Sequence, residues 1–288
     1  MLPAEFDYVR PAGVQEAVQA LAQYGEEGKI LAGGQSLIPL LKLRFAQPRM
    51  LIDVNRLRDL DYVRIDGSWM HIGALTRQAH LASSDVVRQY VPAIATASIH
   101  VSDPIVRNWG TIGGTLAHAD PAGDLGSVMI AVDAEFEALS VRGERTIRAR
   151  EFFEGPFTTT LQPDELLTEI RVPLAQGRVF GTYLNLERKI GDFSTVGVAV
   201  HLDMNDGTCR QAGIGLTAVG SINLEAKEAA ARLRGRQLDD EAIAEAARLA
   251  AEASDPTSDQ RGSAEYKRDV VRVFVQRALR QARRSNEL

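Results

Sequence analysis

Two pairs of adjacent glycines, far apart along the chain, are the residues best placed to bind a charged ligand. The first pair, Gly33-Gly34, follows a short apolar stretch and precedes Gln35-Ser36 and an apolar segment with helical spacing. Glycines at a strand end let backbone N–H groups approach a ligand without a Cβ in the way. Ser36 is placed to cap the following helix, whose first turn offers unpaired N–H donors. The pattern predicts either a phosphate or diphosphate site or an ordinary strand–turn–helix corner.

The second pair, Gly113-Gly114, is flanked by two small hydroxyl residues, Thr111 and Thr115. Because a diphosphate carries two charged groups, two such segments can hold it from opposite sides. No lysine follows the glycines in either segment, which excludes the loop that binds a nucleoside triphosphate. Neither segment reads G-x-G-x-x-G with an acidic residue downstream, so the dinucleotide fingerprint of the doubly wound fold is also missing. Together the two segments predict one diphosphate site.

These motifs resemble the FAD-binding medium subunit of molybdenum hydroxylases, the group that includes the xanthine dehydrogenase FAD subunits. The nearest likeness is to the flavoprotein of aerobic carbon monoxide dehydrogenase and its nicotine-, quinoline- and purine-oxidising relatives. The resemblance spans essentially the whole chain, in the expected order. It rests on Ala32-Gly-Gly-Gln-Ser36, Thr111-Ile-Gly-Gly114, Ala119-Asp-Pro-Ala-Gly-Asp124, Arg188-Lys-Ile-Gly-Asp-Phe193, Asp255-Pro256, Arg261 and Glu265-Tyr-Lys267.

Composition indicates an ordinary soluble globular protein. The 288 residues are 45% hydrophobic and 25% charged, long enough for two or three subdomains. The net charge of −5 argues against a nucleic-acid binder, which would carry a basic stripe. Met1 to Arg10 contains Glu5 and Asp7 and has no apolar run typical of a secretory signal. We therefore expect a cytoplasmic protein, associated with a membrane only through partners.

The single cysteine restricts where metal chemistry can take place. Cys209 alone can form neither an internal disulfide nor a Cys₄ iron–sulfur or zinc site. The five histidines show no i, i+4 pair and no carboxylate in a ligand pattern, so we expect no metal in this chain. If the resemblance holds, the iron–sulfur clusters must lie in another polypeptide.

Periodicity predicts an α+β fold in three parts. Residues 1–58 read as strand, helix, strand, helix, strand, a small α/β lobe. Residues 59–177 form a second lobe that opens with a hairpin around Asp66-Gly67. Residues 178–288 begin with β-like segments, 181–199 and 213–219, and end with helices over 224–233, 239–253 and 264–282. The resemblance implies the two-lobed FAD-binding fold of the vanillyl-alcohol-oxidase/PCMH type, followed by a domain of antiparallel strands and three helices.

The resemblance assigns the FAD diphosphate to the two glycine segments. One side follows Ala32 and consists of the backbone amides of Gly33, Gly34, Gln35, Ser36 and Leu37. The other side consists of Gly110, Thr111, Gly114 and Thr115.

The resemblance also assigns residues to the rest of the cofactor. Val101 and Ser102 lie along it, and Asp124 accepts hydrogen bonds from ribityl or ribose hydroxyls, a role that suits an ionised acceptor. Leu161 packs against the adenine or a ring edge. The alternative interpretations are a turn residue for Asp124 and a core residue for Leu161.

Two positions depart from the commonest pattern of the family. Gln35 stands where carbon monoxide dehydrogenase flavoproteins typically have histidine, although relatives with other substrates also carry glutamine. Phe193, after Asp192, occupies a position often held by tyrosine or tryptophan near the isoalloxazine ring; its alternative is a core residue in a strand. His118 is expected near the ribityl chain, behind the residues that touch it.

The resemblance implies an oxidoreductase that transfers electrons. No Ser/His/Asp set, carboxylate pair or metal–water arrangement stands out in the sequence, so we expect no acid–base substrate chemistry in this chain. Substrate hydroxylation takes place at a molybdenum cofactor in a large subunit, and two-iron clusters in a small subunit carry electrons to the FAD of this chain. A quinone, NAD⁺ or dioxygen is the terminal acceptor, and the assembly is a dimer of heterotrimers. Two alternatives remain: a stand-alone FAD-dependent oxidoreductase of the same fold, and a sugar-nucleotide or phosphate-binding module without a redox role.

Overall fold

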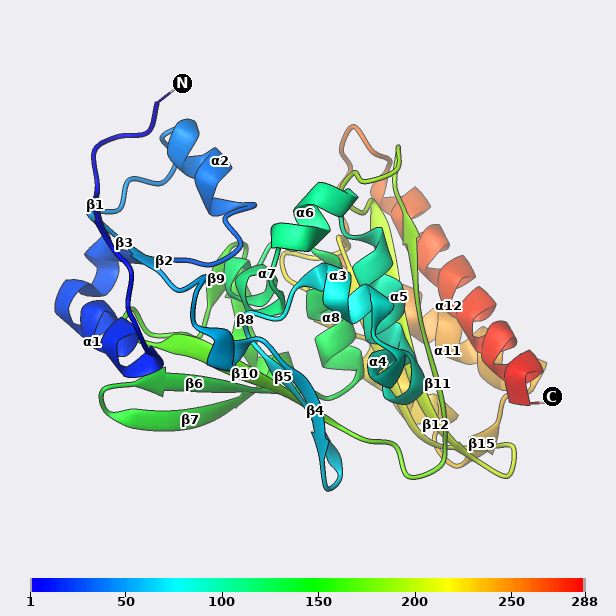
Figure 1. Ribbon diagram of the computed structural model, residues 1–288. Helices are drawn as coiled ribbons and strands as arrows, with labels where there is room; N and C mark the ends of the chain where they lie inside the picture. The colour runs from blue at the N-terminus through cyan, green and yellow to red at the C-terminus, as the bar shows by residue number, and fades with distance from the viewer. Residues whose placement is uncertain (1, 287–288) are drawn as a thin grey trace.

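The computed structural model describes residues 2–286, which form three main sheets and the helices that cover them (Figure 1). The first sheet is parallel, with strand order β1-β3-β2, and the predicted alternation of strands and helices is confirmed. Its connections are helical, because each parallel pair needs a crossover. The elements are β1 (Asp7–Val9), α1 (Val14–Tyr24), β2 (Gly28–Leu31), α2 (Leu37–Lys42) and β3 (Met50–Asp53).

The second sheet has strand order β4-β5-β10-β6-β7 and is antiparallel. The predicted hairpin is confirmed: Asp66 pairs with Trp69, and Gly67 takes a positive φ of 56° that favours glycine. The strands are β4 (Val63–Asp66), β5 (Trp69–Gly73), β6 (Glu135–Ser140), β7 (Gly143–Arg148) and β10 (Leu166–Pro173). A small separate pair consists of β8 (Phe153–Gly155) and β9 (Thr158–Thr159).

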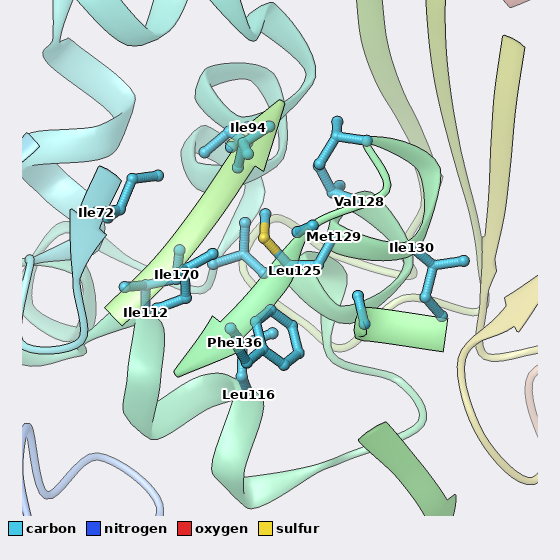
Figure 2. Close-up of a cluster of buried hydrophobic side chains, with 14 of the residues drawn as sticks. Ile72, Ile94, Ile112, Leu116, Leu125, Val128, Met129, Ile130, Phe136 and Ile170 are labelled. Atoms are coloured by element: carbon cyan, nitrogen blue, oxygen red, sulfur yellow. The ribbon is translucent and has the colours of Figure 1, made fainter. Parts of the chain in front are cut away.

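Short helices α3 to α8 are inserted in the chain between β5 and β6 of the second sheet, and α9 follows β7. The two 3₁₀ turns in the first half of the chain are η1 (Gly25–Glu27) and η2 (Arg58–Leu60). The helices are α3 (Gln78–Ser83), α4 (Asp85–Tyr90), α5 (Pro92–His100), α6 (Pro104–Trp109), α7 (Ile112–His118), α8 (Asp124–Ala131) and α9 (Ala149–Phe152). The core in Figure 2 joins Ile112 and Leu116 of α7, Leu125 of α8 and Phe136 of β6. Burial of these side chains fixes both helices and therefore the residues at their N-termini.

The third sheet is antiparallel and has helices on both faces. Helices α10–α12 pack on one face, and α5 and α8 pack on the other. A Cβ at Gly213 or Gly215 would lie within 2.0 Å of a carbonyl oxygen of α8, so only glycine permits this close approach. The elements are β11 (Arg178–Leu186), β12 (Val196–Asn205), β13 (Thr208–Thr217), β14 (Leu224–Glu225), α10 (Lys227–Leu233), β15 (Arg236–Gln237), α11 (Asp240–Ala253) and α12 (Ala264–Asn286).

One predicted strand region is wrong in part. The expected β-like segment 181–199 is two strands, β11 and β12, separated by an irregular loop over residues 187–195. Polar residues and Gly191, whose φ is 83°, interrupt the alternation there. Within residues 2–286, no helix combines the length and the apolar character needed to cross a membrane.

Candidate functional site

The two glycine segments lie against each other. A Cβ at Gly33 would be 2.3 Å from the carbonyl oxygen of Trp109 and 2.9 Å from the Cα of Gly110. A Cβ at Gly114 would lie 4.0 Å from the Cβ of Ala32. Segments 32–37 and 110–115 therefore meet at one place, and Gly33 has no side chain because the opposite backbone occupies that space.

The first segment presents unpaired backbone donors. Within the part of the chain that the structure describes, the amides of residues 33–37 donate no hydrogen bond, while Ile38 N donates to Gly34 O at 3.0 Å. Gly34 has φ +73°, a conformation that L side chains rarely adopt. The free N–H groups lie just before helix α2 and at its first residue, where the helix dipole also favours an anion. This segment can bind a phosphate group through its backbone.

The prediction that Ser36 caps α2 is wrong. Its side chain accepts no hydrogen bond from the helix, because its own backbone is helical, with φ −105° and ψ −47°. A capping side chain reaches the helix amides from an extended backbone. The first amides of α2 are therefore left without a side-chain acceptor.

The second segment is built differently, since most of its amides are already paired. Thr111 caps α7, and its Oγ1 accepts from Gly114 N at 3.1 Å. The amides of Ile112 and Gly113 donate to carbonyl oxygens of residues 76 and 74. Gln78, which the sequence did not single out, donates through Nε2 to Thr115 Oγ1 at 2.6 Å. On this side the Thr115 hydroxyl is partly exposed, Thr111 is buried and caps α7, and Gly114 contributes an open surface.

Val101 and Ser102 lie beside the loop that carries Asp192. Arg107 donates to the carbonyl oxygens of Val101 at 3.0 Å and Ser102 at 2.9 Å, and Ser102 has a positive φ of 43°. A Cβ at Gly191 would lie 3.2 Å from Ser102 O, so segment 101–102 and loop 187–195 are in contact. The arginine bonds hold Ser102 in a backbone conformation that a non-glycine residue rarely adopts.

Loop 187–195 is held in place by Arg261, from the C-terminal part of the chain. Arg261 donates to Asp192 Oδ1 at 3.0 Å and to Phe193 O at 2.5 Å. The Phe193 side chain is 55% exposed, which excludes its interpretation as a core residue. An exposed aromatic ring on a braced loop can contact a flat ring system.

Asp124 begins α8 and is tied to the third sheet. Its Oδ1 accepts hydrogen bonds from Tyr183 Oη and Ser194 Oγ, each at 2.7 Å. Oδ2 accepts none from the residues that the structure describes, which leaves it available to ligand hydroxyls. Burial raises the pKa of Asp124 above its ordinary value of 3.8, although the two hydroxyl bonds act in the opposite direction. No local sequence pattern indicates Tyr183 or Ser194, which lie 59 and 70 residues away.

We expect Asp124→Asn to raise the thermal stability of the cofactor-free chain at pH 7 while weakening FAD binding about tenfold. A carboxyl group whose pKa is higher in the folded protein than in the unfolded chain stabilises the fold while it is protonated, below about pH 3.8. This contribution to the free energy of unfolding is lost as the pH rises through the pKa of the folded state. The amide of asparagine stays neutral at every pH, so the variant does not lose this stability as the pH rises. The amide also replaces the free acceptor Oδ2 with an N–H donor, which weakens binding of ligand hydroxyls. Melting curves from pH 4 to 8 and an FAD titration measure the two effects. A lower melting temperature for the variant at every pH contradicts the expectation.

The last two predicted residues lie close to the core. Leu161 is partly buried and packs against the cluster of Figure 2, a position that agrees with its alternative as a core residue. The His118 ring centroid is 5.1 Å from that of Phe157, and burial lowers the pKa of this histidine. His118 therefore packs against an aromatic ring at the end of α7, where burial disfavours its charged form.

Comparison with protein families identifies the chain. The FAD binding domain in molybdopterin dehydrogenase matches residues 4–175, more than half of the 288. The chain belongs to this family. The CO dehydrogenase flavoprotein C-terminal domain matches residues 181–282. The resemblance, the α+β fold and FAD as the cofactor of this chain are thereby confirmed.

Individual relatives match over nearly their full length. The carbon monoxide dehydrogenase medium chain of Hydrogenophaga pseudoflava is 42% identical, covering 98% of both chains. The glyceraldehyde dehydrogenase medium chain of Sulfolobus acidocaldarius is 37% identical, covering 98% of this chain and 99% of the relative. A solved carbon monoxide dehydrogenase from Hydrogenophaga pseudoflava superposes with a TM-score of 0.94 and 43% identity, covering 98% of this chain and 99% of that chain. These relatives are dehydrogenase subunits, which confirms the assignment of this chain to the oxidoreductases.

Proposed function

We propose that this chain is the electron-transfer subunit of a heteromeric molybdenum hydroxylase and holds one FAD between lobes 1–58 and 59–177, with domain 178–288 bracing the site. When bound, the flavin accepts single electrons from iron–sulfur clusters of a partner and delivers pairs to a terminal acceptor. The chain itself binds and orients the cofactor. One observation carries the proposal: residues 33–37, whose five backbone amides donate no hydrogen bond within the described part of the chain, follow directly on the point where Gly33 meets the second glycine segment.

The residues fit the chemistry of FAD. The amides of 33–37 and the hydroxyls of Thr111 and Thr115 are donors, as an anionic diphosphate requires. Asp124 offers a free carboxylate oxygen for sugar or ribityl hydroxyls. Val101, Ser102, Asp192 and Phe193 lie together and suit the isoalloxazine end.

The proposed partners are a molybdenum-binding large subunit and an iron–sulfur small subunit, assembled as a dimer of heterotrimers in the cytoplasm. The medium-chain names of the relatives support this assembly. Those relatives are named for different substrates, carbon monoxide and glyceraldehyde, although both match this chain closely. We therefore place substrate choice in the large subunit, and leave quinone, NAD⁺ and dioxygen as the classes of acceptor to assay.

The first test is the absorbance spectrum of the purified full-length chain, before and after incubation with FAD. We expect flavin bands and about one FAD per chain. A chain that stays colourless after incubation supports the phosphate-binding alternative and contradicts the proposal.

The second test separates the subunit from a stand-alone oxidoreductase of the same fold. The chain alone, loaded with FAD, is expected to reduce no dye with candidate substrates such as carbon monoxide or aldehydes, whereas co-expression with both partner subunits restores reduction. Turnover by the isolated chain overturns the subunit assignment.

A further inference from the structure

We propose that Asn55 and Arg77 form a bridge that locks the two glycine segments together and supplies a positive charge beside the diphosphate. The proposal rests on the proposed function, because it takes these segments as the diphosphate site. Both side chains act as positioning residues: Asn55 contacts the carbonyl oxygen of Ala32, the first residue of one segment, and Arg77 contacts that of Trp109, immediately before the other.

Asn55 holds the first segment. Its Nδ2 donates to the carbonyl oxygen of Ala32 at 2.5 Å and to that of Leu31 at 3.4 Å. Its orientation is fixed by Asp53, whose Oδ1 accepts from both the backbone N and Nδ2 of Asn55 at 2.9 Å. Asp53 is itself held by the Tyr8 hydroxyl, which donates to Oδ2 at 2.5 Å. With Nδ2 committed to Ala32, Oδ1 of Asn55 points the other way as an acceptor.

Arg77 completes the connection to the second segment. Its Nη2 donates to Asn55 Oδ1 at 3.1 Å, and its Nη1 donates to the carbonyl oxygen of Trp109. That same oxygen occupies the space where Gly33 has no Cβ. The path from Ala32 through Asn55 and Arg77 to Trp109 therefore spans the contact between the segments. A rigid guanidinium fork suits this double role, and lysine could not fill it.

Arg77 is also a half-buried cation that forms no salt bridge with any carboxylate in residues 2–286. Burial lowers its pKa, as does the neighbouring charge of Arg58, whereas Asp61 acts in the opposite direction. A buried charge without a counter-ion is unfavourable unless an anion or hydrogen bonds compensate it. Its two hydrogen-bond acceptors are neutral, and Asp61 lies beyond salt-bridge distance, so the diphosphate between the segments is the anion that this charge suits.

A double-mutant cycle on FAD binding tests the bridge. FAD is titrated into the cofactor-free full-length chain and its Asn55→Ala, Arg77→Ala and doubly substituted forms, following flavin fluorescence. We expect each single change to raise the FAD Kd about tenfold or more, and the double change to add little beyond the larger single effect, because either change breaks the same path. The proposal of a bridge is overturned if the fold-changes in Kd of the two single variants multiply in the double variant, or if the Kd values are unchanged.

Salt dependence tests the charge separately. In Arg77→Gln the FAD Kd is expected to rise less steeply with added NaCl than in the wild type, whereas Arg77→Lys keeps the wild-type slope with a weaker Kd. Arg49→Gln is the matched control, because it removes one exposed charge paired with Glu27 at the opposite end of β3. Equal slopes for Arg77→Gln and the wild type, or the same flattening in the control, contradict the charge role. If the wild-type chain binds no FAD, the proposed function fails instead.

Discussion

Gly33→Ala is expected to raise the FAD Kd about 100-fold or more. The new Cβ would lie 2.3 Å from the carbonyl oxygen of Trp109, closer than Cβ atoms approach other atoms. The obstacle is backbone rather than a flexible side chain, and Arg77 holds that carbonyl in place. The two segments must therefore separate, at a cost of about 1–3 kcal/mol from overpacking alone. Equilibrium titration with FAD measures the loss.

Gly13→Ala is the matched control for this change. A Cβ at Gly13 meets no atom of residues 2–286 within 4 Å, and its backbone is extended, with φ −152°. We expect the control to bind FAD like the wild type, with a melting temperature within a few degrees of it. Normal FAD affinity in Gly33→Ala contradicts the close contact of the two segments as a condition for binding.

Gly114→Val is expected to abolish FAD retention while the protein stays folded. Gly114 lies on the exposed side of α7, and its Cβ would meet only Thr111 Oγ1 at 2.8 Å and Ala32 Cβ at 4.0 Å. Valine therefore fills the open space beside the first segment, where the diphosphate is proposed to lie. The helix itself loses little, since glycine is a worse helix former than valine. The ratio of flavin to protein absorbance after gel filtration measures retention.

The control substitution Ala231→Val distinguishes steric exclusion of FAD from the general effect of placing a β-branched residue in a short helix. Ala231 is exposed on α10. This helix has the same seven-residue length as α7 but packs on the third sheet. We expect full FAD occupancy in this control. Equal occupancy in Gly114→Val would falsify the assignment of the second glycine segment.

The sequence predicted those elements of the fold that depend on residues close together in the chain. The parallel first sheet and the Asp66-Gly67 hairpin follow from apolar periodicity and turn chemistry, which act within a few residues. The Ser36 cap was wrong because the backbone at a cap position depends on how the preceding glycines turn. The two glycine segments predicted a ligand site. Their sequences could not reveal that one segment offers backbone amides and the other side-chain hydroxyls.

The residues that the sequence did not reveal act across long separations. Tyr183 reaches Asp124 from 59 residues away, and Arg77 reaches Trp109 from 32. A tyrosine in a strand and an arginine before a helix are common surface or core residues, and neither pattern indicates a partner. Only the packing of the third sheet on α8 and of α3 on α6 brings these side chains to the site.

A crystal structure of the FAD-loaded chain tests the central claim most directly. We predict that both phosphorus atoms lie between the two glycine segments, with phosphate oxygens about 2.7–3.2 Å from amides of residues 33–37 and from the hydroxyls of Thr111 or Thr115. A diphosphate bound elsewhere on the chain, or held by only one of the segments, contradicts the account.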